Sequence, residues 1–142
     1  PNDRIELYFN GGLLRAKIEQ YIGPDTNLND RDAAHAPTYT MSTGWEYRYP
    51  SGLFMMISAS ARDEFYFDVS HNQKSKAFEL LNARLGFEKD NWSIQLWGKN
   101  LTNKDFSVRG FYFGNEPPDF PNMLYTRRGD PRQVGLTFDM RF

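Results

Sequence analysis

The chain contains no cysteine, so a disulfide framework, a thiolate nucleophile and a zinc–thiolate site are all excluded. Long hydrophobic runs are also missing. The longest unbroken run, Leu53 to Ile57, is far shorter than the ~18 residues that a membrane-spanning helix needs. A helical membrane protein is therefore excluded, whereas a transmembrane β-barrel is not.

An excess of charge of one sign is lacking as well. The 17 Lys and Arg residues and the 18 Asp and Glu residues leave a net charge of -1, and the basic residues form no stripe along the sequence. Nucleic acid is therefore not an expected partner. The chain opens at Pro1 without a basic and apolar signal segment, so we expect a processed or excised piece of a longer protein.

Aromatic residues are abundant, with 12 Phe, 8 Tyr and 3 Trp in a chain whose mean hydropathy is -0.69. Their spacing explains this combination. From Gln133 to Phe142 polar and apolar residues alternate strictly, which is the period of a β-strand with one apolar and one polar face. The same period predicts further strands at 37–49, 53–61, 81–87 and 92–96, a short one at 14–18 and a truncated one at 4–9.

The predicted connections alternate in length. Tight turns rich in Gly, Pro, Asn and Asp are expected at Asn10-Gly11-Gly12, Pro50-Ser51-Gly52 and Lys89-Asp90-Asn91. Long loops are expected at 23–36, 63–76 and 102–131. Short and long connections in turn, with strands near the ~9–11 residues that cross a bilayer, predict an all-β, antiparallel up-and-down transmembrane β-barrel.

Strand parity assigns each residue to the lipid or to the barrel interior. In the last strand it keeps Asp139 and Arg141 away from lipid, where a basic residue at the midplane would cost ~2–4 kcal/mol. Near residue 98 the parity fails, because Gly98 and Asn100 fall on the lipid side and Leu101 inward. This predicts either a bulge or an Asn100 at headgroup depth. The residues expected to face inward are Glu46, Arg48, Arg62, Asn82, Arg84, Gln95, Lys99, Asp139 and Arg141.

Aromatic residues gather where the two membrane interfaces would lie, which predicts two girdles. The girdle near the short turns would comprise Trp45, Tyr47, Tyr49, Phe87, Trp92 and Phe142. The girdle near the long loops would comprise Tyr21, Phe65, Tyr66, Phe67 and Phe106. Three alternatives stay open at this point: a soluble β-sandwich or calycin-like binder, a small complete outer-membrane barrel, and a passive porin.

Three stretches resemble the C-terminal third of the TonB-dependent outer-membrane receptors. They are Ala36-Pro37-Thr38-Tyr39-Thr40, the segment from Trp97 to Phe106 that contains Asn100-Leu101, and Gly129-Asp130-Pro131-Arg132-Gln133-Val134-Gly135 ahead of a terminal Phe. The resemblance covers the chain from about residue 36 onward, and its specificity lies in the combination and order of these elements.

The resemblance implies that residues 1–142 are the last six or seven strands of a 22-stranded barrel in the bacterial outer membrane. The rest of the barrel and the plug domain would come from another chain or from residues outside this one. The implied partners are the TonB complex, reached through the plug, the lipids of the outer membrane and the barrel assembly machinery. The implied function is energy-coupled uptake of a siderophore or another scarce solute.

The loop at 102–131 combines aromatic rings with cations, which suits a ligand at the receptor mouth. We expect its ligand-binding residues to be Arg109, Phe111, Tyr112, Phe113, Tyr125 and Arg127. The alternate apolar residues before the C-terminus resemble a barrel-assembly signal comprising Phe138, Met140 and Phe142.

No enzymatic activity is expected, because nothing orients a nucleophile or a pair of acids. We also expect no cofactor and no metal. His35 and His71 lie in different loops without a second ligand at a suitable spacing. The run Asp25, Asn27, Asn29 imitates the start of a calcium loop, but the required Gly and Glu are missing further along.

Overall fold

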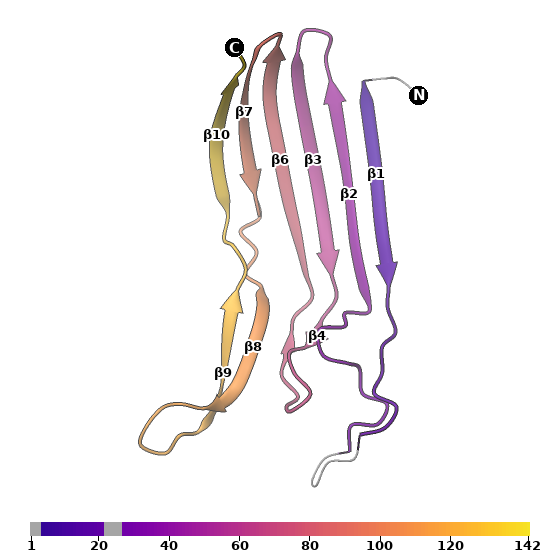
Figure 1. The fold of residues 1–142 in the computed structure, drawn as a ribbon, viewed down its shortest axis with the longest axis vertical. Coiled ribbons are helices and arrows are strands. Elements are labelled where there is room, and N and C mark those ends of the chain that lie inside the picture. Colours follow the sequence, from indigo (N-terminus) through magenta and orange to yellow (C-terminus); the bar gives the residue numbers. More distant parts are fainter. Residues whose placement is uncertain (1–3, 22–26) are drawn as a thin grey trace.

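A computed structural model describes residues 4–21 and 27–142, and all of their regular secondary structure is antiparallel β-sheet (Figure 1). Two short hairpins lie outside the main sheet, β4 (Phe65–Tyr66) with β5 (Lys74–Ser75) and β8 (Ser107–Gly114) with β9 (Asn122–Arg128). The main sheet has six strands, in the order β1 (Ile5–Leu13), β2 (Tyr39–Arg48), β3 (Leu53–Arg62), β6 (Phe78–Lys89), β7 (Trp92–Lys99) and β10 (Gln133–Met140).

The spatial order of the six main strands follows the sequence, so each strand pairs with the next one along the chain that belongs to this sheet. In Figure 1 the connections from β2 to β3 and from β6 to β7 are short and lie at the top. The other three connections are long and lie at the bottom. The predicted all-β, antiparallel, up-and-down arrangement is therefore confirmed. No helix able to span a bilayer occurs within residues 4–21 and 27–142.

The register divides the sheet into two chemically different faces. One row of directly paired residues crosses all six strands and is entirely apolar or aromatic: Ile5, Tyr47, Met55, Leu85, Leu96 and Leu136. We call this side the apolar face. The neighbouring row belongs to the opposite side, the polar face, and contains Glu6, Glu46, Met56, Arg84, Trp97 and Gly135.

Charged residues on the apolar face are confined to strand ends. Glu79 lies at the long-loop end of β6 and Lys89 at its short-turn end, and every other position that shares this face is uncharged. The residues expected to face inward lie together on the polar face, and Arg141, just past β10, borders the same side with Asp139. Their grouping on one face is therefore confirmed.

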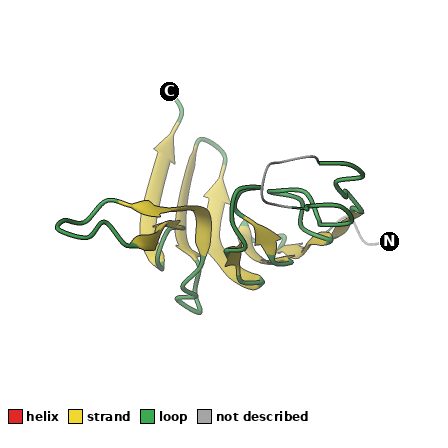
Figure 2. Ribbon diagram, turned by 90° about the horizontal axis from the view of Figure 1, so that it is seen from below, coloured by secondary structure: helices red, strands yellow, loops and turns green. Residues whose placement is uncertain are grey.

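The apolar face has no protein layer over it in the part of the chain that the structure describes. Leu7, Leu96 and Leu136 are 72%, 51% and 67% exposed. Seen from below in Figure 2, the strands of the main sheet form one layer with no second sheet stacked on it. The total surface is 10524 Å², whereas a compact monomer of this mass exposes about 7,600 Å².

Buried apolar side chains occur instead near the long loops. Leu28, Phe65, Phe67 and Phe78 are the large apolar side chains that are buried among the described residues. Phe78 opens β6, and the other three belong to the connections or to the β4–β5 hairpin. The arrangement differs from a β-sandwich, whose core lies between the inner faces of two sheets.

The expected turn at Asn10-Gly11-Gly12 is wrong. Strand β1 runs through it, because Asn10, Gly11 and Gly12 pair in register with Ser42, Met41 and Thr40 of β2. The expected strand at 14–18 is also wrong, since these residues form only one isolated bridge, between Lys17 and Asp32. Backbone hydrogen bonds from 14–18 to 31–38 extend the β1–β2 pairing irregularly, which explains the apolar alternation seen in the sequence.

The structure places the residues of the two predicted aromatic girdles in different surroundings. On the apolar face near the short turns, rings lie close together: Trp45 is 6.3 Å from Tyr47 along β2, and Phe87 of β6 is 5.6 Å from Trp92 of β7. At the long-loop end, however, Phe65 and Phe67 are each only 3% exposed and pack edge to face on one another. The expectation that they form a girdle is wrong, because they form the core of the loop cluster.

Three aromatic side chains on the polar face lie flat over a glycine of the neighbouring strand. The pairs are Tyr8 with Gly44, Phe54 with Gly86 and Trp97 with Gly135, each directly opposite in the register. A ring can cover the neighbouring backbone only where no Cβ is present, and such pairs help fix the register of a sheet. These glycines therefore have a packing role within strands.

We expect the substitution Gly135→Ala to destabilise the protein by about 1–3 kcal/mol through overpacking. Its Cβ would lie 2.3 Å from Trp97 Cζ2, and all three of its close contacts are atoms of that ring. In a Trp97→Ala background the same change should cost almost nothing. Urea unfolding of the four variants of the double-mutant cycle measures the coupling, and an equal cost in both backgrounds would contradict the packing role.

Candidate functional site

The predicted ligand-binding residues lie on the β8–β9 hairpin, a structure that the sequence did not predict within the loop at 102–131. Arg109 pairs with Arg127 and Phe111 with Tyr125, so these four side chains share one face of the hairpin. Phe113 has the same parity, and its ring lies 5.2 Å from that of Tyr125. The hairpin thus brings together two cations and three rings.

Tyr112 lies on the other face of the hairpin. Its ring is 5.5 Å from that of His71, and the neighbouring Gly110 is covered by the ring of Phe67. This face therefore packs on the segment between β4 and β5, which leaves the face that carries Phe111 and Arg127 exposed. Tyr112 is separated from the other five predicted residues.

Electrostatic contacts order the exposed face of the hairpin. The guanidinium of Arg109 lies 5.0 Å from the centre of the Phe111 ring, and the Tyr125 hydroxyl donates a hydrogen bond to Glu116 Oε1 at 3.2 Å. Desolvation and the nearby Glu116 carboxylate raise the pKa of Tyr125. The phenol therefore stays neutral and, with its hydrogen donated to Glu116, can serve a ligand as a hydrogen-bond acceptor or as an aromatic platform.

Arg31 holds two long loops together. Its guanidinium donates hydrogen bonds to the backbone carbonyls of Asp68, Val69 and His71 and lies 4.1 Å from the centre of the Tyr66 ring. These contacts join the connection after β1 to the β4–β5 hairpin. Ser75 then joins that hairpin to β8, because its hydroxyl donates to the Ser107 carbonyl at 3.2 Å. The loops therefore form one connected cluster.

Two charged groups in the β4–β5 hairpin have shifted pKa values. The hydrogen bond and ion pair with Glu64 at 2.8 Å raise the pKa of Lys74. The backbone N–H of Ser70 donates to Asp68 at 2.9 Å and lowers the pKa of that carboxyl. Both groups are charged at neutral pH, and both contacts stiffen the loop.

Asn100 organises the junction between the sheet and the β8–β9 hairpin. It is only 4% exposed and adopts a φ of 47°, which ends β7. Its amide nitrogen donates to the carbonyls of Lys104 and Asp130, and its amide oxygen accepts from the backbone N–H of Lys104. Nearby, Asn103 accepts a hydrogen bond from the backbone N–H of Arg132 at 3.0 Å. Two of the stretches that carry the family resemblance thus form one structural unit.

Of the two predictions for this junction, the bulge at Gly98 is wrong, whereas an Asn100 at headgroup depth stays a prediction. Gly98 pairs regularly with Ala83 and Val134, and Asn100 is buried in the turn. Leu101, predicted to face inward, covers Gly98 on the apolar side. The positive φ of Asn100 reverses the parity at this point.

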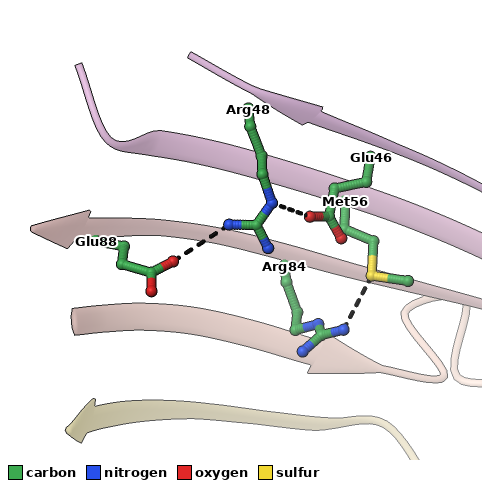
Figure 3. Close-up of polar contacts among 5 residues, drawn as sticks. All are labelled: Glu46, Arg48, Met56, Arg84 and Glu88. Carbon is green, nitrogen blue, oxygen red and sulfur yellow. Dashed lines mark hydrogen bonds and ion pairs between the residues drawn. The ribbon is translucent and has the colours of Figure 1, made fainter. Parts of the chain in front are cut away.

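The polar face carries a charge ladder near the short turns, shown in Figure 3. Arg48 Nε lies 2.6 Å from Glu46 Oε1, and Arg48 Nη1 lies 3.2 Å from Glu88 Oε2. Arg48 is thus held between two carboxylates. Arg84 lies beside this group, but its contact in Figure 3 is with the sulfur of Met56 at 3.0 Å.

A hollow of about 430 Å³ lies where the polar face meets the β8–β9 hairpin. Its lining includes Lys99 and Gln133 from the sheet, Arg127 from the hairpin and Phe106 from the junction. One predicted ligand residue, Arg127, therefore borders a space that the sheet also lines. The contribution of Lys99 to this space follows from the fold and not from the loop sequence.

The remaining sequence candidates lie apart from this space. Phe138, Met140 and Phe142, the predicted assembly signal, are exposed along the outer strand β10 and beyond it. His35 lies 5.3 Å from the Phe65 ring, and His71 accepts a hydrogen bond from the backbone N–H of Gln73.

Part of the calcium-like run lies outside the described residues, including Asp25. The side chain of Asn27 accepts a hydrogen bond from the backbone N–H of Asn29, and that of Asn29 accepts one from Tyr21. These two side chains therefore stabilise the local backbone. Comparison with known proteins gave no match to a family model and no match to a solved structure.

We expect Asn100→Gly to destabilise the protein by about 2–4 kcal/mol, because it removes three side-chain hydrogen bonds at a buried position while keeping the positive φ accessible. Asn100→Ala should cost about 1 kcal/mol more through backbone strain. Asn103→Gly is the matched control, since Asn103 has a similar φ of 51° but accepts the one bond from Arg132. Equal losses for Asn100→Gly and Asn103→Gly in urea unfolding would contradict the role of Asn100.

Proposed function

We propose that this chain is the C-terminal barrel segment of a TonB-dependent outer-membrane receptor, which imports a scarce solute with energy supplied through TonB. The observation that carries the proposal is the apolar face, six strands wide, exposed, and free of charge between its two rims. Hydrocarbon tails would cover this face without a second protein layer, and its reverse would face an aqueous interior.

The dimensions of the strands support a transmembrane position. Strands β2 and β3 have 10 residues each. A strand of that length is about 33 Å long and, when tilted by about 40°, covers the ~25 Å apolar band of an outer-membrane barrel. The girdle of Trp45, Tyr47, Phe87 and Trp92 would then lie at the interface on the short-turn side.

The edges of the sheet support the need for further strands. Among the described residues β1 pairs with β2 alone and β10 with β7 alone. Unpaired backbone groups at membrane depth cost several kcal/mol each, so both edges would be closed by the rest of a barrel. Six strands at ~4.8 Å make an arc of roughly 29 Å, which suits part of a large plugged barrel.

The resemblance of the sequence narrows this proposal from a barrel to a receptor. Its stretches around Asn100 and Asp130 meet in space and support the β8–β9 hairpin, whose cations and rings would contact the solute at the outer mouth. In this proposal the chain transports and does not catalyse. It acts with a plug domain and TonB, and the assembly machinery inserts it into the bacterial outer membrane.

We expect Leu96→Arg to destabilise the protein in phospholipid vesicles by about 2–4 kcal/mol, because the cation would face the bilayer near its midplane. The matched control is Gln95→Arg, one residue away on the polar face, which should change the stability little. Guanidinium unfolding in vesicles measures both. If water covered the apolar face, the half-exposed Leu96 would tolerate arginine as well as Gln95 does.

Quenching by brominated lipids gives an independent test in the protein that contains this chain. Trp45 and Trp92 on the apolar face should be quenched, whereas Trp97 on the polar face should not. Planar bilayers then separate a receptor from a porin. A receptor should show little steady conductance and bind the periplasmic domain of TonB, whereas a passive porin would conduct steadily without TonB.

A further inference from the structure

We propose that the polar face holds a binding site for an oxyanion, the carboxylate or phosphate group of a solute, in a hollow over β3, β6, β7 and β10. The hollow has a volume of about 370 Å³. Its polar lining residues are Ser58, Asn82, Arg84, Gln95, Lys99 and Thr137. A volume of this size lies within the range of small-molecule sites.

The charge of the hollow is of one sign. Arg84 and Lys99 both line it, and no Asp or Glu is among its lining residues. In the described part of the chain no carboxylate lies within 4 Å of either cation. Arg84 contacts a thioether, Met56 Sδ, and Lys99 lies over the ring of Trp97. Both are weak partners that leave the cations able to bind an anion.

Arg48, on the same face, differs from Arg84 and Lys99 because its charge is paired with carboxylates. Figure 3 shows it between Glu46 and Glu88, while Arg84 lies next to this group without a carboxylate. Met56 lies between Glu46 and Arg84 in the row of paired residues and separates the two charges. The unpaired state of Arg84 therefore follows from the register, which places a neutral residue where an acid could have paired with it.

The neutral groups of the hollow also present hydrogen-bond donors. The side-chain oxygen of Asn82 accepts the backbone N–H of Asn100 at 3.0 Å, so its amide NH2 group is the part left for a ligand. Thr137 Oγ1 accepts from Trp97 Nε1 at 3.1 Å, which leaves its hydroxyl hydrogen free to donate. Two cations and two oriented donors match the acceptor oxygens of a carboxylate or phosphate.

The hollow continues toward the loop end of the sheet. Asn82 and Lys99 line both this hollow and the larger one that Arg127 borders. An anion bound at the β8–β9 hairpin could thus pass from Arg127 to Lys99 and on to Arg84. The inference rests on the proposed function, since it requires the polar face to enclose water, and it assigns an anionic group to the transported solute.

The test uses iodide as an anionic quencher of Trp97, in the folded protein that contains this chain, with a Trp97→Phe variant to isolate the signal of this residue. Lys99 Nζ lies 5.6 Å from the centre of the Trp97 ring, so an anion held at Lys99 is within reach of the indole. Arg84→Gln and Lys99→Gln should each lower the iodide quenching constant about two- to fivefold. Quenching by neutral acrylamide should not change.

Lys89→Gln is the matched control, because it removes the same charge from the rim of the apolar face and should leave iodide quenching unchanged. In the unsubstituted protein, added inorganic phosphate should compete with iodide and reduce the quenching. Equal iodide quenching in Arg84→Gln, Lys99→Gln and Lys89→Gln would overturn the proposal. So would a Trp97 that neither quencher reaches, since a lumenal polypeptide would then fill the hollow. Brominated-lipid quenching of Trp45 and Trp92 is separate, so failure here is distinguishable from failure of the proposed function.

Discussion

The apolar face of the six-stranded sheet has to be covered by something other than water, and the rest of the structure depends on this constraint. Burial of apolar surface stabilises a protein by roughly 25 cal/mol per Å², and the chain exposes more surface than a compact monomer of its mass. Its buried side chains lie at the loop end and do not supply a core for the sheet. A covering medium would therefore contribute much of the stability of this fold.

The polar face has a different requirement, because its charged side chains need partners or water. Flat rings over Gly44, Gly86 and Gly135 leave little side-chain bulk above the sheet. Near the short turns Arg48 is paired with both Glu46 and Glu88. Toward the long loops the balance shifts to unpaired cations. One face therefore combines a region of paired charges with a region that attracts anions, and strand register determines where each lies.

Strand parity was the part of the fold that the sequence predicted best, since a period of two leaves little choice of face once one side is apolar. The predictions were wrong where the same residue types are common in two different kinds of structure. Gly11 and Gly12 resemble a turn but belong to β1 and pair with β2. Phe65 and Phe67 resemble membrane-interface residues but form the core of the loop cluster. The β8–β9 hairpin was missed because its strands are interrupted by glycine and arginine and lack clear alternation. The sequence could not show that Arg127 and Lys99 line the same hollow, because the fold brings these distant residues together.

The connection between the β8–β9 hairpin and the main sheet depends on the buried side-chain amide of Asn100. Asn100 ends β7 with a positive φ, moves Leu101 to the apolar side, and fixes the segment around Asp130 that leads into β10. Hydrogen bonds from Asn100 to Lys104 and to Asp130 connect both ends of the β8–β9 hairpin to this junction. The hydrogen bond from the backbone of Asn100 also orients Asn82 in the hollow. The same residue therefore contacts both the segment that supports the outer hairpin and a residue of the proposed anion site.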